Sequence, residues 1–149
     1  MTDSNQKEIR RFLKFATVGA AGSVTDFAVL NILIQLFGFP LALANLFSFT
    51  AAVIQNFILN RMWTFPESRG RKARNQLLQF TIVSIVGLAI NQAVFLGINA
   101  LLLPHWNEWI ANPELAYTIS YNFAKLFAIG VVLFWNFFVN RYITYSDVE

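Results

Sequence analysis

Four long apolar segments fill most of this 149-residue sequence, and each has about 20 residues or more. A helix of about 20 apolar residues crosses the roughly 30 Å hydrocarbon core of a bilayer. Because lipid offers no hydrogen-bonding partner to the backbone, such segments fold as helices. The sequence therefore predicts an all-α membrane protein that forms a single integral membrane domain over residues 1–149. Its four transmembrane helices are expected at about 12–37, 41–62, 77–103 and 116–141.

The composition agrees with a membrane location. Charged residues make up 13% of the chain, which is about half of their share in soluble domains. The first apolar segment is too long for a secretory signal peptide and carries Asp26, so we expect it to remain as a transmembrane helix. The sequence contains no cysteine, which excludes disulfide bonds and thiolate chemistry.

The sequence repeats itself. Residues 55–65 read QNFILNRMWTF, and residues 135–145 read WNFFVNRYITY, 80 positions later. A weaker echo at a separation of 65 links the first apolar segment with the third. We therefore predict two copies of one helical hairpin, over residues 12–65 and 77–145. Each copy crosses the membrane twice, so the repeat is expected to be parallel rather than inverted.

The positions of Lys and Arg predict the orientation in the membrane. These residues precede the first helix, lie between the second and third, or follow the fourth, and the connections 38–40 and 104–115 contain none. The positive-inside rule then places both termini and the middle connection in the cytoplasm. The same rule accounts for the basic stretch 69–74, so no nucleic-acid partner is expected, whereas contact with membrane lipids is.

Two charged residues are expected at membrane depth. Asp26 lies well inside the first helix, and Lys125 lies inside the fourth. Such a charge is costly in lipid, so each should face the interior of the bundle and have a partner. The repeat matches Asp26 with Asn91 and Lys125 with Asn45, and all four lie at similar estimated depths. We expect this quartet to line a polar site, although a purely structural Asp26–Lys125 pair is an equal alternative.

A second polar layer is expected at the cytoplasmic helix ends. The motif Asn-x-x-x-Asn-Arg occurs once in each repeat and supplies the residues Asn56, Asn60, Arg61, Asn136, Asn140 and Arg141. Two guanidinium groups with four amides could receive a phosphate, because Arg offers a planar pair of donors. Capping and snorkelling of the helix ends is the alternative interpretation.

The expected outer connection, 104–115, is longer than its counterpart in the first repeat. Trp106 and Trp109 suggest a short segment in the outer membrane interface, acting as an anchor or as a lid. His105 is the single histidine and has no nearby cysteine, so it makes a poor metal ligand or catalytic base. No catalytic or nucleotide-binding motif is present. The chain is therefore expected to be no enzyme and to use no metal or cofactor.

Three stretches together resemble the GtrA-like family of small four-helix membrane proteins. They are residues 10–33, the motif 55–65, and the closing motif 136–145, and the similarity extends over about residues 8–146. The resemblance implies translocation of a polyprenyl-phosphate-linked sugar, typically undecaprenyl-phosphate glucose, for cell-surface polysaccharide synthesis. It also implies a bacterial or archaeal cytoplasmic membrane and a separate membrane glycosyltransferase that makes the lipid-linked sugar.

Two other functions remain open on sequence grounds. The first is a membrane anchor or scaffold for a glycosyltransferase, which would need no polar layers at membrane depth. The second is a small multidrug exporter, which Lys125 disfavours because such exporters bind cations through an acidic residue. A homo-oligomer is also open, because four helices form a thin wall around a bulky polar headgroup.

Overall fold

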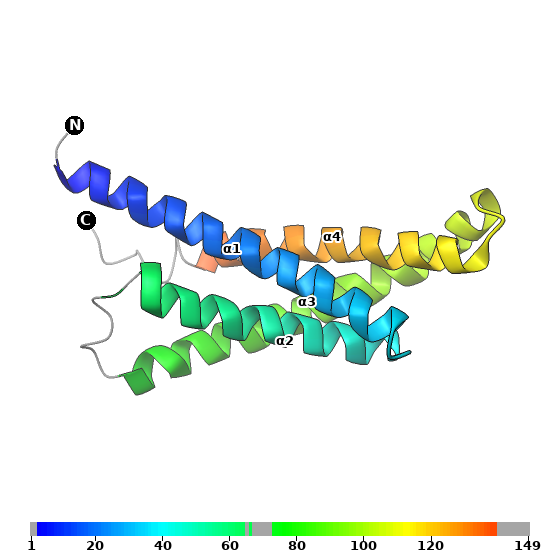
Figure 1. Cartoon of the computed structure of the whole chain (residues 1–149), viewed down its shortest axis with the longest axis horizontal. Helices are drawn as coiled ribbons and strands as arrows, with labels where there is room; N and C mark the ends of the chain where they lie inside the picture. Colours follow the sequence, from blue (N-terminus) through cyan, green and yellow to red (C-terminus); the bar gives the residue numbers. More distant parts are fainter. Residues whose placement is uncertain (1–2, 65, 67–72, 140–149) are drawn as a thin grey trace. The chain divides into compact units, whose positions relative to one another are not determined.

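The computed structural model of the chain describes residues 3–64, 66 and 73–139. Throughout these residues the regular structure is helical, without a strand. The elements in chain order (Figure 1) are α1 Asp3–Gln35, α2 Leu41–Leu59, the π-helical turn η1 Asn60–Thr64, α3 Ala73–Trp109 and α4 Pro113–Val139. Within the described residues, four stretches are long and apolar enough to span a membrane: Asn5–Gln35, Leu41–Thr64, Thr81–Trp109 and Pro113–Asn136. The predicted all-α membrane fold with four spanning helices is confirmed.

Two helices are longer than the sequence suggested. α1 begins at Asp3, nine residues before the apolar segment, because the polar N-terminal stretch continues the helix. α3 continues through Pro104 to Trp109, so most of the expected outer loop is helical. Only residues 110–112 separate α3 from α4.

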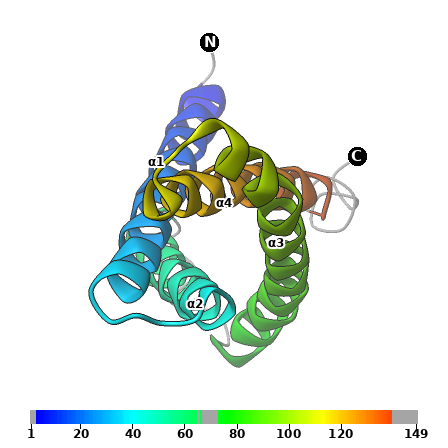
Figure 2. The same ribbon diagram turned by 90° about the vertical axis from the view of Figure 1, so that its right-hand side faces the viewer.

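Packing divides the chain into two units, Met1–Ser84 and Ile85–Glu149, which are described separately. In the first unit, α1 and α2 form an antiparallel hairpin, and Figures 1 and 2 both show the two helices side by side. Gly38 ends α1 with a φ of 63°, a left-handed conformation that glycine adopts without steric cost. The amide groups of Gly38 and Phe39 bond back to the carbonyls of Ile34 and Leu33, which satisfies the end of the helix.

Contacts along the hairpin fix the register of α1 against α2. Near the open end of the hairpin, Lys14 Nζ donates a hydrogen bond of 3.2 Å to the carbonyl of Trp63. Further along, Thr25 Oγ1 donates one of 2.6 Å to Gln55 Oε1. The 11 residues from Lys14 to Thr25 correspond to the eight residues from Trp63 back to Gln55, so the two helices run antiparallel.

In the second unit, the start of α4 is capped by a side chain. Asn112 Oδ1 accepts hydrogen bonds from the amides of Glu114 (3.0 Å) and Leu115 (3.2 Å). Asn is a favoured N-cap residue, and Pro113 occupies the first helical position, where its missing N–H costs nothing. This local pattern explains why α4 begins at Pro113 rather than at 116 as expected.

Pro104 bends the C-terminal end of α3. Ser120 Oγ on α4 donates a hydrogen bond of 2.8 Å to Asn99 Oδ1 on α3, which sets the register of the two helices. In that register a straight α3 would carry Trp106 far past Phe123, yet the two ring centroids are 6.0 Å apart. Proline cannot donate the helical hydrogen bond and often kinks a helix. Figure 2 shows the last turns of α3 turning away from the direction of its main part.

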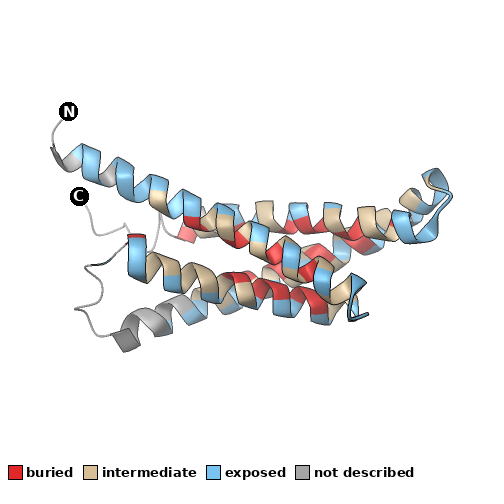
Figure 3. Ribbon diagram, viewed as in Figure 1, coloured by how far each residue is buried: buried red, intermediate tan, exposed pale blue. Residues whose placement is uncertain are grey.

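Buried positions recur every four residues along α1 and α3, and these stripes are visible in red in Figure 3. α1 buries Val18, Gly22, Asp26 and Leu30, and α3 buries Gly87, Asn91, Phe95 and Asn99. Three members of each stripe correspond at the separation of 65 that the sequence repeat predicts. Many large apolar side chains on the other faces are exposed, as expected of helices that face lipid.

Candidate functional site

Polar side chains are buried within the segments that can span a membrane. Asp26 is 3% exposed and Lys125 is 0% exposed, as the cost of placing a charge in lipid requires. The other buried polar side chains within these spans are Asn45, Ser48, Thr64, Asn91, Asn99 and Ser120. Such groups are rare in the hydrocarbon region, and they often mark substrate or ion pathways.

In the first unit, polar side chains connect α1 and α2 near Asp26. Thr25 bonds to Gln55, and Asp26 follows Thr25 on the buried face of α1. One turn before Asp26, Gly22 lies directly against the side chain of Asn56. This cluster of Thr25, Asp26, Gln55 and Asn56 contains one carboxylate, two amides and one hydroxyl.

Asn56, which the sequence places in the expected cytoplasmic polar layer, packs against Gly22 of α1. A Cβ atom added at Gly22 would lie 2.6 Å from Asn56 Nδ2 and even closer to its Oδ1, so the amide fills the space that glycine leaves. The Oδ1 atom of Asn56 is buried and accepts no hydrogen bond from the described residues. Asn56 therefore lies at the level of Gly22, one turn from Asp26 along α1, and three residues before the end of α2 at Leu59.

Asn45 lies in another part of the hairpin. The register set by Thr25 and Gln55 brings Asp26 opposite residues 53–54 of α2. Asn45 is about eight residues further along, or roughly 12 Å at the rise of an α-helix. It is fully buried, and its carbonyl accepts a hydrogen bond of 3.1 Å from Ser48 Oγ. Within this unit, Asp26 and Asn45 therefore lie at different depths.

In the second unit, Lys125 lies beside an aromatic ring. Its Nζ is 5.6 Å from the ring centroid of Phe95, which gives the ammonium a cation–π contact. Asn91 is buried one turn before Phe95 on the same face of α3. On the other side of Phe95, Asn99 lies one turn further along α3 and accepts the hydrogen bond from Ser120. Lys125 thus has polar neighbours along α3 on both sides of the Phe95 ring.

The expected quartet is divided between the two units. Asp26 and Asn45 belong to the first unit, and Asn91 and Lys125 belong to the second. All four are buried. Coupling between Asp26 and Lys125 stays a prediction.

Of the polar layer that the sequence predicts at the cytoplasmic helix ends, the structure describes all three residues for the first repeat only. Arg61 is half-buried in η1, and Asn60 Oδ1 accepts a hydrogen bond of 2.9 Å from Thr64 Oγ1. Thr64 is buried. A π-helical turn is rare and often occurs at functional positions. In the second repeat Asn136 is half-buried, and Asn140 and Arg141 lie outside the described residues.

Sequence reasoning missed four polar residues that the structure places in these clusters: Thr25, Gln55, Asn99 and Ser120. Asn99 could have been found, because it continues the four-residue spacing from Asn91 through Phe95. Gln55 directly precedes Asn56, but only the helix register shows that it reaches Thr25. No pattern in the sequence singles out Ser120.

The chemistry of these groups suits a ligand that is polar and either uncharged or anionic. Amides and hydroxyls can donate to and accept from sugar hydroxyls, and Lys or Arg can bind a phosphate. Among residues 3–64, 66 and 73–139, no group of three or more His, Cys, Asp or Glu side chains could hold a metal ion.

Comparison with known proteins identifies relatives of this arrangement. Residues 14–145 match the family model described as GtrA/DPMS, transmembrane domain. The chain is also 28% identical over 141 residues to a dolichol-phosphate mannosyltransferase of Pyrococcus furiosus. That match covers 93% of this chain but 35% of the relative, so the chain spans about a third of the length of the protein it matches. No solved structure matches the chain.

Proposed function

The chain belongs to the GtrA/DPMS transmembrane-domain family, and from this membership and its buried polar side chains we propose that it translocates a polyprenyl-phosphate-linked sugar across the membrane. Undecaprenyl-phosphate glucose, or a similar lipid-linked sugar, is the proposed substrate. The product would serve cell-surface polysaccharide synthesis or modification. The chain would make and break no covalent bond, so it would not itself be an enzyme.

The observation that carries this proposal is the complete burial of Lys125 within a membrane-spanning helix. A buried charge is not needed to hold helices together, because apolar residues of similar volume often pack as well or better. A cation beside Phe95 and close to amide side chains can instead stabilise a phosphate that moves through a region without water.

The polar groups occur at several depths, which suits a headgroup that moves stepwise. Arg61 would receive the phosphate at the inner end of the first unit. The cluster around Asp26 would exchange hydrogen bonds with sugar hydroxyls, and Asn45 offers a further polar group toward the outer end. The polyprenyl tail would stay in lipid, against the exposed apolar side chains of the helices.

One observation favours a second function. The matched relative is named a mannosyltransferase, and this chain covers only 35% of its length. A chain of this family could therefore anchor or position a glycosyltransferase without moving any lipid. Such a scaffold would not require Lys125 or Asp26 to be charged.

A leaflet-translocation assay separates the two proposals. The purified full chain is reconstituted into liposomes with a fluorescent undecaprenyl-phosphate glucose, and accessibility of the lipid to a membrane-impermeant quencher is followed with time. We expect movement between leaflets to be faster than in protein-free liposomes. Lys125→Met keeps the side-chain length and removes the charge, so it should slow movement at least tenfold while the protein remains folded.

The control is Leu126→Met, which makes a similar substitution on the exposed face of α4 and should leave the rate unchanged. If the wild-type protein moves the lipid no faster than empty liposomes, the transport proposal is wrong. If Lys125→Met retains the full rate, transport does not depend on this charge.

A further inference from the structure

The inner end of the first unit carries a basic surface that the proposed transport does not use. We infer that a phospholipid with an anionic headgroup binds there, across the first turns of α1 and the π-helical turn η1. The inference is independent of the proposed function, because a bound phospholipid would stabilise or orient the protein whether or not it transports anything. Its central residue is Lys14.

Lys14 is held in place by two contacts with one residue. Its Nζ donates a 3.2 Å hydrogen bond to the carbonyl of Trp63 and lies 5.4 Å from the centroid of the Trp63 ring. A lysine ammonium has three donors, so two remain for another acceptor. Because the side chain is already ordered and half-buried, binding an anion would cost little side-chain entropy.

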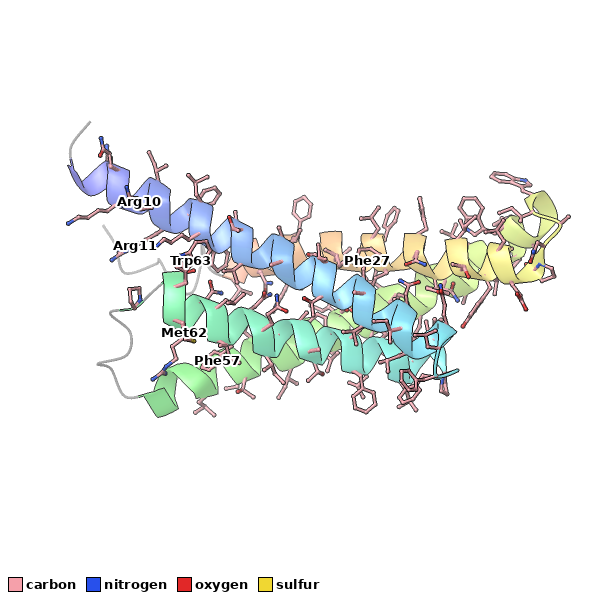
Figure 4. All side chains as sticks on the ribbon, viewed as in Figure 1. Arg10, Arg11, Phe27, Phe57, Met62 and Trp63 are labelled. Carbon is pink, nitrogen blue, oxygen red and sulfur yellow. The ribbon has the colours of Figure 1, made fainter. Side chains whose placement is uncertain are left out.

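Lys14 ends a basic stripe along α1. Lys7, Arg10, Arg11 and Lys14 are spaced by three and four residues, so they share one face of the helix. Asp3 and Glu8 also lie in this stretch, and four basic with two acidic residues leave a net charge of +2. Figure 4 shows Arg10 and Arg11 at the same end of the hairpin as Met62 and Trp63.

Apolar side chains beside the stripe favour a lipid over a soluble anion. On α1, Ile9, Phe12 and Leu13 are exposed, and on η1 Met62 and Trp63 are exposed. A helix segment with a basic face and a bulky apolar face binds at the boundary between headgroups and acyl chains. Trp63 also suits this depth, because its ring is apolar and its N–H is polar. The phosphate would contact Lys14 and the stripe, and the acyl chains would cover the apolar side chains.

The test measures binding of phosphatidylglycerol to the detergent-solubilised full chain by native mass spectrometry, with phosphatidylcholine as the zwitterionic control. Each basic residue near a membrane surface contributes enough to change affinity about fivefold. We expect Lys14→Gln to weaken phosphatidylglycerol binding about fivefold and Arg10→Gln with Arg11→Gln to weaken it about 25-fold. Lys14→Arg should keep most of the affinity, and phosphatidylcholine binding should not change in any variant.

Several outcomes would overturn the inference. Equal affinity for the two phospholipids, or full phosphatidylglycerol binding by both sets of Gln variants, would show that the basic surface is only solvated. Competition by inorganic phosphate at equal concentration would indicate a soluble ligand, and tighter binding of undecaprenyl phosphate would make this a substrate site. The double Arg variant alters exposed residues, so it tests the inference even if Lys14→Gln fails to fold.

Discussion

Gly22 allows α1 and α2 to approach closely one turn before Asp26. A Cβ atom there would meet the Asn56 amide at less than van der Waals distance, so Gly22→Ala would force this side chain to move. We expect the substitution to destabilise the protein by about 1–3 kcal/mol, as overpacking of a core commonly does. The measurement is the midpoint of thermal unfolding in detergent.

Gly19 provides the matched control one turn earlier on α1. A Cβ atom at Gly19 would have nothing within 4 Å, so Gly19→Ala should be neutral or stabilise the helix by up to about 1 kcal/mol. In an Asn56→Ala background, where the amide is gone, Gly22→Ala should lose most of its cost. An equal cost of Gly22→Ala in both backgrounds would mean that Asn56 is not what makes glycine necessary.

At the scale of the helix, Pro104 determines where the C-terminal end of α3 lies. Pro104→Ala restores a backbone donor, so α3 should straighten and carry Trp106 away from Phe123. In a variant whose Trp63, Trp109 and Trp135 are replaced by Phe, we expect the fluorescence emission of Trp106 to shift when Pro104 is replaced. Pro113→Ala, at the first position of α4, should leave the emission unchanged. An identical spectrum for Pro104→Ala would show that neighbouring contacts, rather than the proline, bend the helix.

The helices themselves were predictable, because long apolar segments in lipid have few alternatives to helix. The burial of Asp26 and Lys125 was predictable for the same reason. The continuation of α3 past Pro104 was not, because proline usually marks a helix end and only packing around Trp106 shows otherwise. The π-helical turn at Asn60–Thr64 and the packing of Asn56 on Gly22 depend on contacts between residues far apart in sequence. No local pattern specifies such contacts.

At the scale of the whole molecule, the orientation of the two repeats decides which transport mechanism is available. Two parallel hairpins cannot alternate between inner and outer openings by rocking of inverted halves, as many transporters do. The headgroup would instead move along polar side chains at successive depths. An antiparallel dimer of two chains inserted in opposite directions would restore the inverted symmetry and with it the rocking mechanism.

The absence of cysteine makes this topology directly measurable. Single substitutions Pro40→Cys and Ala111→Cys mark the two connections without Lys or Arg. Gln6→Cys marks the opposite side, and Ser68→Cys and Ser146→Cys mark positions outside the described residues. In intact cells, a membrane-impermeant maleimide should label Pro40→Cys and Ala111→Cys, and it should label the other three only after permeabilisation, because positive charge is retained in the cytoplasm.

Labelling of positions 40 and 111 from opposite sides would contradict the parallel repeat. Partial labelling of all five positions would indicate that the chain is inserted in both directions. In that case we would expect the headgroup to move by rocking of two oppositely inserted chains, rather than within one chain.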